Sequence, residues 1–364
     1  MITSRLLRTL SAVMCASFLL ANQVHAKSLK DERVTDGPYI DVHNKALTVN
    51  WICDDQVKHS QLTLEGDSLP YSFNACGLTA TTSQLHFDEQ LIEYQNVKRV
   101  AALSDLHGQY ELMLTLLKNN KIIDKNNRWA FADGHFVITG DIFDRGDTVT
   151  EALWLIYKLE QQALAAGGKL HYLLGNHEYM VLRDDQRYLH PKYVHAVSHF
   201  NNDLRQQYSN NSVLGRWLRS KSTIININGF IFLHGGIHQD FLDLKLSLEQ
   251  ANSEFRKTIG LGKKALKENP AWLTLHGSNG PIWYRGYFRD DALNDTQVDA
   301  VLSQLNGKKV IVGHTSMPTI ETRFNSKIIA IDSSIKRGEK GEILLWQNGE
   351  FKRGLMSGEQ KPLQ

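Results

Sequence analysis

Cysteine is scarce in this sequence, with 3 among 364 residues. None of Cys15, Cys53 and Cys76 stands in a metal-binding or catalytic pattern. Their placement argues against a zinc site built from thiolates and leaves oxygen and nitrogen side chains as the candidate metal ligands.

The sequence also lacks a large excess of charge of either sign. Lys and Arg number 41 against 39 Asp and Glu, and without Arg5 and Arg8 near the N-terminus the two totals are equal, apart from 15 histidines. A surface that binds nucleic acid or another polyanion is therefore not indicated. Internal repeats and low-complexity tracts are absent, and the 42% hydrophobic content allows a substantial buried core.

The N-terminus has the pattern of a secretory signal peptide. Arg5 and Arg8 precede an apolar run over 9–21, and the small-x-small triplet Val24-His25-Ala26 follows it. We predict a signal peptide over residues 1–26, because the run is too short to span a bilayer comfortably. An uncleaved anchor is the alternative. The mature chain is then expected to be secreted and to have no membrane anchor.

Residues 27–38 are polar and predict a flexible lead-in. Short β-favouring runs with turn residues follow over 39–97 and indicate a small β-rich appendage. Signal cleavage leaves Cys53 and Cys76 as an even pair in an oxidising compartment, which favours a disulfide between them, with two unpaired buried thiols as the alternative. Residues 356–364 are expected to form a tail.

From residue 98 to 355 the pattern changes to short apolar runs separated by helical stretches, which is typical of a layered α/β domain. The clearest helices are expected at 111–117 and 150–166. Two segments rich in Tyr, Trp, Arg and His, 179–222 and 246–281, interrupt the rhythm and are expected to form a cap or rim over the site. Strands are expected at 310–312, 328–331, 343–346 and 351–353, the last two as a hairpin around Asn348-Gly349.

Five apolar runs each end in a loop that carries possible metal ligands. The loops are Asp105-Leu106-His107-Gly108, Gly140-Asp141-Ile142-Phe143-Asp144-Arg145-Gly146, Gly175-Asn176-His177-Glu178, His234-Gly235-Gly236 and Gly313-His314-Thr315. In an α/β sheet, ligands gather outside the carboxyl ends of the strands, so we expect the loops to converge. Asp, His and Asn suit Mn²⁺, Fe or Zn²⁺, and a carboxylate such as Asp141 can bridge two ions.

Each motif taken alone has a structural explanation. Asp105-Leu106-His107 would be an ordinary surface loop, and Gly175-Asn176-His177-Glu178 a turn with a helix cap. His234 and His314 singly would be core histidines with satisfied hydrogen bonds. These explanations fail jointly, because all five loops would have to follow strand-like runs by chance.

The motifs resemble those of the metallo-dependent phosphoprotein phosphatases, which are calcineurin-like metallophosphoesterases, and most closely the bacterial Shewanella-like phosphatases. The resemblance covers 97–335 and rests on the first three loops above. It implies an α/β fold with two mixed sheets flanked by helices. It also implies two divalent metal ions, a phosphorylated protein or peptide as substrate, and preference for phosphotyrosine. Together with the signal peptide, the bacterial character of the resemblance predicts a periplasmic location, with release into the medium as the alternative.

The resemblance further implies roles for single residues. Asp105 and His107 would hold the first ion, Asp141 would bridge, Asn176, His234 and His314 would hold the second, Arg145 and Arg285 would bind phosphate, and His177 supported by Asp144 would protonate the leaving group. A metal-bridging hydroxide would attack the phosphorus, since two cations lower the pKa of water. For Arg285 the alternative is an ordinary rim arginine.

The last motif narrows the expected activity. Many related phosphodiesterases end in Gly-His-x-His, whereas Ser316 occupies the last position here and favours monoesters. Two other functions remain to be weighed. One is a diadenosine tetraphosphatase-like nucleotide pyrophosphohydrolase, which near-neutral charge does not favour. The other is an inactive metal-binding sensor, which would need none of His177, Asp144 and Arg145.

Overall fold

The computed structural model describes residues 33–44, 46–64, 69–200, 203–290 and 292–363. The signal peptide predicted over 1–26 lies outside the described residues. The described residues from Val34 onward form one compact unit, and two six-stranded mixed sheets make up its centre. Among the described residues, no helix is long and apolar enough to cross a membrane.

The first sheet has the order β17-β16-β15-β7-β8-β9. Its parallel half consists of β7 (Arg99–Leu103), β8 (His135–Ile138) and β9 (Lys169–Tyr172), and these strands are almost wholly buried. Near-continuous apolar runs are what parallel strands covered on both faces require. The antiparallel half adds β15 (Glu342–Gln347), β16 (Glu350–Leu355) and β17 (Gln360–Pro362).

The second sheet has the order β13-β14-β12-β11-β10-β6. Parallel pairs join β11 (Phe230–Leu233), β12 (Lys309–Val312) and β14 (Ile328–Ala330). The remaining strands are β6 (Glu93–Tyr94), β10 (Ile225–Ile227) and β13 (Glu321–Arg323). Side chains of the two sheets are in contact, since the ring of Phe230 in β11 lies 5.3 Å from that of Trp346 in β15. The predicted α/β fold with two mixed sheets is confirmed.

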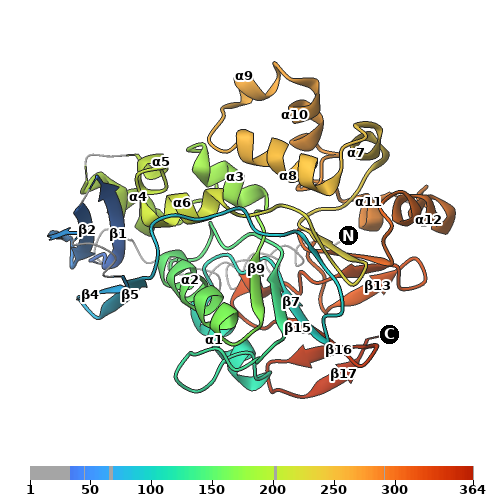
Figure 1. The fold of residues 1–364 in the computed structure, drawn as a ribbon, viewed down its shortest axis with the longest axis horizontal. Helices are drawn as coiled ribbons and strands as arrows, with labels where there is room; N and C mark the ends of the chain where they lie inside the picture. Colours follow the sequence, from blue (N-terminus) through green and yellow to red (C-terminus); the bar gives the residue numbers. More distant parts are fainter. Residues whose placement is uncertain (1–32, 45, 65–68, 201–202, 291, 364) are drawn as a thin grey trace, which may run out of the picture. The chain divides into compact units, whose positions relative to one another are not determined.

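Helices α1 (Tyr110–Asn119) and α2 (Val149–Ala165) lie beside the parallel half of the first sheet, with α2 packed against β9 (Figure 1). Buried side chains at helical spacing, such as Leu153, Ile156 and Tyr157, form the face of α2 that packs on the core. Both helices match the sequence expectation within two residues at each end.

The segments expected to form a cap or rim are helical. The first contributes α3 (Asn176–Leu182), α4 (Pro191–Ser198), α5 (Leu204–Gln207) and α6 (Val213–Arg219). The second contributes α8 (Leu248–Lys257), α9 (Lys263–Leu266) and α10 (Pro270–Leu275), which gather with α7 (Gln239–Asp243) in Figure 1. The last helices are α11 (Gly286–Arg289), α12 (Asp295–Gln304) and the short 3₁₀ helix η2 (Ile335–Arg337).

The N-terminal part is β-rich. It contains the antiparallel sheet of β1 (Asp36–His43), β2 (Ala46–Cys53) and β3 (Gln56–Thr63), and the hairpin of β4 (Tyr71–Ala75) and β5 (Leu78–Thr82). A disulfide joins Cys53 to Cys76, whose Cα atoms are 5.7 Å apart.

The borders of this part differ from the sequence expectation. β1 begins inside the expected lead-in because Asp36 is buried and accepts a hydrogen bond from Thr150 of α2 (3.2 Å). β6 belongs to the second sheet, where it pairs with β10, although it lies within 39–97.

Candidate metal centre and active site

The five predicted loops converge because they follow β7, β8, β9, β11 and β12 at their carboxyl ends. Within each of the two sheets the parallel strands are in register, so the last residues of β7, β8 and β9 lie at one edge and those of β11 and β12 at another. Many site residues have a left-handed backbone, which is costly for residues other than glycine and clusters at functional sites. These are Asp105 (φ 55°), His107 (46°), Asp141 (59°), Asp144 (71°), Arg145 (68°) and His314 (63°).

Two glycines make the close packing of these loops possible. Gly140 has a φ of 103°, and a Cβ there would meet the backbone of Gly175. A Cβ on Gly313 would meet the side chains of Ser104 and Asp105. Larger residues at either position would push the strand ends apart.

A first group of ligand atoms lies around Asp141. Its Oδ2 atom is 3.6 Å from Nε2 of His107, and that nitrogen is 3.8 Å from Oδ1 of Asp105. All three residues are buried. Asp105 is held by Ser104 Oγ (2.7 Å) and the backbone N–H of His314 (2.8 Å), which both donate to its Oδ2.

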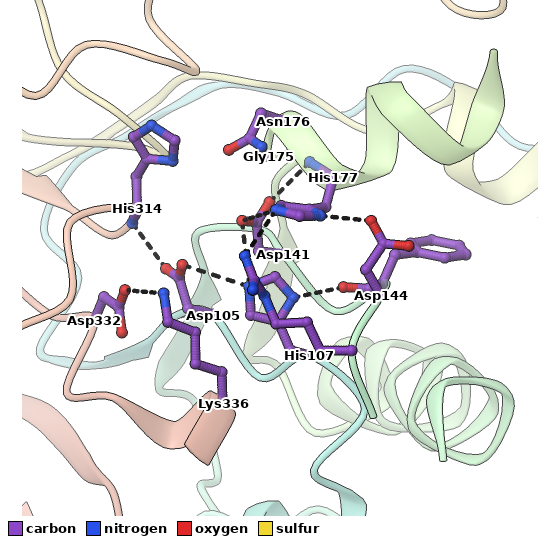
Figure 2. A network of polar contacts seen from close by, with 12 residues as sticks. Asp105, His107, Asp141, Asp144, Gly175, Asn176, His177, His314, Asp332 and Lys336 are labelled. Atoms are coloured by element: carbon purple, nitrogen blue, oxygen red, sulfur yellow. Dashed lines mark hydrogen bonds and ion pairs between the residues drawn. The ribbon is translucent and has the colours of Figure 1, made fainter. Parts of the chain in front are cut away.

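A second group shares the same carboxylate oxygen. Oδ2 of Asp141 is 3.1 Å from Nε2 of His234. That nitrogen is also 2.9 Å from Oδ1 of Asn176 and 3.1 Å from Nδ1 of His314. Asp141 is therefore common to both groups, as expected for a bridging ligand. Figure 2 shows Asp141 between the loops of Asp105, His107 and Asn176.

The donor set fits divalent cations. Nδ1–H of His107 donates to the carbonyl of Phe143 (2.7 Å), and Nδ1–H of His234 donates to that of Thr139 (2.8 Å). Nε2–H of His314 donates to the carbonyl of Trp283 (3.1 Å). Each bond turns the lone pair of the other ring nitrogen toward the ligand groups, the usual arrangement of metal-bound histidine.

The electrostatics also favour a cation beside Asp141. Burial lowers the pKa of His234, but the charge of Asp141 outweighs it and raises that pKa to about 9. For His107 the balance is reversed: burial lowers its pKa to about 3, and the opposing effect of the Asp141 charge is smaller. Burial likewise holds the pKa of His314 well below its usual range. His107 and His314 are therefore neutral, which is the form of imidazole that binds metal, whereas His234 carries a proton that a bound cation would displace.

His177 and Asp144 form a separate pair. Nδ1–H of His177 donates to Oδ2 of Asp144 at 2.5 Å, while Nε2 lies 3.8 Å from Oδ2 of Asp141 (Figure 2). Burial lowers the pKa of His177, but the charges of Asp141 and Asp144 outweigh it and the pKa is raised. The Nε2 atom is therefore suited to carry and release a proton near neutral pH.

Arg145 lies at the exposed mouth of the site. Its guanidinium nitrogen Nη2 is 3.5 Å from Nε2 of His177, and its central carbon is 5.2 Å from the centroid of the Tyr188 ring. The Tyr188 ring is itself 5.2 Å from the ring of His177 and 45% exposed. The segment 179–222 thus places one aromatic ring beside the catalytic candidates.

Other aromatic residues of that segment pack inward. Tyr193, Tyr208 and Trp217 are buried, and Phe200 contacts the ring of Tyr39 at 5.5 Å. They join the segment to the core and do not line the mouth.

Arg285 lies beside His314, in the second group of ligand atoms. Its Nη1 atom donates to the carbonyl of His314 and approaches Oγ1 of Thr315 (3.4 Å), and its Nη2 is 3.3 Å from Nδ1 of His314. Burial lowers its pKa from the usual arginine value. All ten residues predicted from the sequence therefore gather at one place.

Glu178 has a role that the sequence reasoning did not assign. Its buried carboxylate accepts hydrogen bonds from the backbone N–H groups of Asp141 (2.8 Å), Ile142 (2.7 Å) and Gly175 (2.7 Å) and from the hydroxyl of Tyr172 (2.9 Å). It connects the loops after β8 and β9. The available signal was its position three residues after Gly175 at the start of a helix, the place of a capping-box glutamate.

Asp332 is a second residue that sequence reasoning missed. It lies beside Asp105 and Lys336 in Figure 2, and its Oδ2 accepts a hydrogen bond from Ser316 (2.6 Å). Burial and then the charge of Asp105 raise its pKa to about 7. No sequence motif marks it, because it follows the strand β14, whose register was not known.

A centre of Asp, His and Asn ligands at the strand ends of two mixed sheets, with a buried His–Asp pair beside it, is the arrangement of a metallophosphoesterase. The comparisons with known proteins agree. A model of the calcineurin-like phosphoesterase family matches residues 98–318. The chain therefore belongs to the calcineurin-like phosphoesterase family and is a metal-dependent phosphoesterase.

Solved structures and curated relatives place the chain near protein phosphatases. It is 42% identical to a cold-active protein-tyrosine phosphatase of a psychrophilic Shewanella species, with 91% of this chain and 99% of the other covered and a TM-score of 0.85. It is 26% identical over 256 residues to Shewanella-like protein phosphatase 1 of Plasmodium berghei, covering 67% and 69% of the two chains. Shewanella-like protein phosphatase 2 of Arabidopsis thaliana is 25% identical over 291 residues, covering 67% and 73%.

Proposed function

We propose that this protein removes phosphate from phosphotyrosine in proteins or peptides. The observation that carries the proposal is the ring of Tyr188 at the mouth, in contact with both His177 and Arg145. A phenyl phosphate bound between the ligand groups and Arg145 would have its ring beside Tyr188, where aromatic pairs contribute about 0.5–1.5 kcal/mol. The 42% identical Shewanella protein is named a protein-tyrosine phosphatase, which supports the same substrate.

The proposed metal ligands are those whose donor atoms converge on Asp141. Asp105, His107 and Asp141 would hold one divalent ion, and Asp141, Asn176, His234 and His314 the other. Mn²⁺, Fe and Zn²⁺ suit this mixture of oxygen and nitrogen donors. When bound, the two ions would lower the pKa of a water molecule for attack and neutralise charge on the phosphoryl oxygens.

The remaining residues act on the substrate. Arg145 and Arg285 would each bind phosphoryl oxygens by charge-assisted hydrogen bonds from opposite sides of the ligand groups. His177 would donate the proton on Nε2 to the departing phenol oxygen. Asp144 holds Nδ1–H of His177, orients the ring and stabilises the imidazolium form.

The proposed location is the periplasm. A disulfide between Cys53 and Cys76 is stable in an oxidising compartment, and the N-terminal sequence pattern would export the chain to one.

The function is tested by steady-state hydrolysis of three substrates: phosphotyrosine peptide, phosphoserine peptide and diadenosine tetraphosphate. The protein is stripped of metal and then supplied with Mn²⁺. We expect the highest kcat/KM on phosphotyrosine and loss of activity in Asp141→Asn and His177→Asn. Preference for the dinucleotide would overturn the substrate and leave the site. No turnover with metal bound would favour a metal-binding sensor.

The role of Tyr188 is tested separately by Tyr188→Leu, with Tyr188→Phe as the matched control. Loss of the ring should lower kcat/KM for phosphotyrosine peptide by about 2- to 12-fold, which corresponds to an aromatic contact of about 0.5–1.5 kcal/mol. Phosphoserine peptide should be affected less. Tyr188→Phe should behave like the unmodified protein, and an equal loss on both peptides would refute the role in selectivity.

A further inference from the structure

A cluster of three ligand-type side chains lies outside the active site. Asp55 is in the turn between β2 and β3, and His195 and His199 are one helical turn apart at the end of α4. Nε2 of His195 is 2.9 Å from Oδ1 of Asp55 and 3.3 Å from Nε2 of His199. Nε2 of His199 is 3.9 Å from the same oxygen. The cluster shares no residue with the groups around Asp141.

The separations of these atoms match tetrahedral coordination. With metal–nitrogen and metal–oxygen bonds of about 2.0–2.1 Å, two ligands of a tetrahedral Zn²⁺ are about 3.3–3.4 Å apart. The two imidazole nitrogens already have this separation, at 3.3 Å. Their distances to the carboxylate oxygen, 2.9 and 3.9 Å, lie on either side of it. Small side-chain rotations would therefore give all three ligands the required spacing.

The carboxylate is positioned before any ion binds. Asp54 and Asp55 both have left-handed backbone angles, φ 51° and 66°, in the tight turn that presents Oδ1 of Asp55 to His195. Oδ1 of Asp55 also accepts the backbone N–H of Val34 (2.9 Å), and the N–H of Asp55 donates to the carbonyl of Val34 (3.0 Å).

The start of α4 is also held in place. Nζ of Lys192 lies 3.0 Å from Asp36 in β1, and the hydroxyl of Tyr193 accepts the N–H of Val149 (2.6 Å). These bonds fix the position of α4, and with it the position of His195 and His199 opposite the β2–β3 turn. The two histidines are on one face of the helix because residues four apart are neighbours.

The chemistry of the set selects a class of ion. Two imidazoles and one carboxylate suit Zn²⁺, whereas Ca²⁺ and Mg²⁺ prefer oxygen ligands. The side chain of His195 is 50% exposed, so water can reach the remaining coordination position. Exposure also means that the ion would exchange with the solvent.

We propose that Asp55, His195 and His199 form a third divalent-metal site, which binds Zn²⁺ and ties the β2–β3 turn to the end of α4. Because the ligands come from segments 140 residues apart in sequence, an ion bound here stabilises the folded chain only. This site does not depend on the proposed phosphatase function.

The test compares the metal-loaded protein with His199→Gln after dialysis against micromolar free Zn²⁺, with bound zinc counted by elemental analysis. His86→Gln is the matched control, because His86 is an exposed histidine that faces a single carboxylate, Asp88, at 3.4 Å. We expect His199→Gln to retain one zinc ion fewer per chain than the unmodified protein and His86→Gln to retain the same number. Phosphatase activity should be equal in all three.

A second readout is thermal unfolding. Added Zn²⁺, beyond what saturates activity, should raise the Tm of the unmodified protein and of His86→Gln but not of His199→Gln. Asp55→Asn preserves the left-handed turn and the bond from Val34, so it should keep its Tm without zinc and lose the zinc-dependent rise. Equal zinc content and equal Tm for the unmodified protein and both site variants would show a hydrogen-bonded cluster only and overturn the proposal.

Discussion

Replacing Glu178 by glutamine tests whether the metal-ligand loops are held by one buried carboxylate. Oε2 of Glu178 accepts the N–H groups of Asp141 (2.8 Å) and Gly175 (2.7 Å), and Oε1 accepts that of Ile142 (2.7 Å) and the hydroxyl of Tyr172 (2.9 Å). Glutamine has one oxygen and one NH₂ group. Whichever way its amide is turned, an N–H donor of the side chain faces donors of the protein.

The size of the effect follows from the number of donors that lose a partner. If the NH₂ group faces Asp141 and Gly175, two buried N–H groups are unsatisfied, at about 1–3 kcal/mol each. If it faces Ile142, the N–H of Ile142 is unsatisfied and the longer bond from the N–H of Phe143 (3.4 Å) is also lost, whereas the hydroxyl of Tyr172 can turn and accept. We therefore expect Glu178→Gln to lower the free energy of unfolding by about 1–6 kcal/mol. Tyr172→Phe removes one donor, leaves no orphan, and should cost about 0.5–1.5 kcal/mol.

Both variants would be measured by urea unfolding and by metal retention against a graded series of chelators. Residues that orient metal ligands typically change metal affinity by about 10- to 100-fold, and Glu178→Gln should fall in this range. If Glu178→Gln were as stable as Tyr172→Phe and bound metal as tightly as the unmodified protein, the carboxylate would not organise the loops and the reasoning would be refuted.

Three further predictions concern the interior and the metals. Lys221→Met should lower the free energy of unfolding in urea by about 3–5 kcal/mol, because it leaves the buried carboxylate of Glu160 without the ammonium group 2.7 Å away. The double variant Lys221→Met with Glu160→Gln should recover most of this loss. Burial lowers the pKa of His135 to about 4 and that of its neighbour His171 well below 6.5. The unfolded chain therefore binds more protons than the folded chain below about pH 6.5. The free energy of unfolding should fall by up to about 1.4 kcal/mol per pH unit per histidine between pH 6.5 and 4. Urea unfolding at several pH values should show a smaller fall in a variant with glutamine at both positions. Chelation should abolish phosphoesterase activity with little change in far-ultraviolet circular dichroism, and Mn²⁺ should restore it; activity that survives complete metal removal would contradict the two-ion centre.

The ligand loops were predictable because their signal is local. A buried parallel strand is an apolar run of a few residues, and the ligand follows within four residues of its end, as Asp105 follows β7 and His234 follows β11. Once five such runs are recognised, the rule for strand ends brings together the loops of each sheet without knowledge of strand order, although it does not show that the two sheets bring their loops to one place. The two long helices of the first sheet were equally clear from their apolar spacing.

What the sequence did not reveal depends on contacts between distant segments. The aromatic content of 179–222 does not show which of its rings lies beside the site: Tyr188 is placed there by the bond from the N–H of Arg145 to its carbonyl (2.9 Å). Asp332 reaches Asp105 only because β14 pairs with β12. The cluster of Asp55, His195 and His199 joins a hairpin turn to a helix end. The four-residue spacing of the two histidines is visible in the sequence, but the contact of either histidine with Asp55 is not.

The same distinction explains how the site is maintained. Left-handed backbone at six site residues is unfavourable by roughly 1–2 kcal/mol each, and buried lone pairs directed at one another add to that cost. The opposing interactions come from groups that are not ligands: the carboxylate of Glu178, the hydroxyl of Ser104 and the carbonyls of Thr139 and Phe143. They bond to the ligand loops or to Nδ1 of His107 and of His234, the ring nitrogen that faces away from the ligand groups. They therefore fix the geometry without competing for the ions. The ligand residues at the strand ends are thus specified by local sequence, whereas their exact positions depend on buried hydrogen-bond partners, several of them elsewhere in the fold.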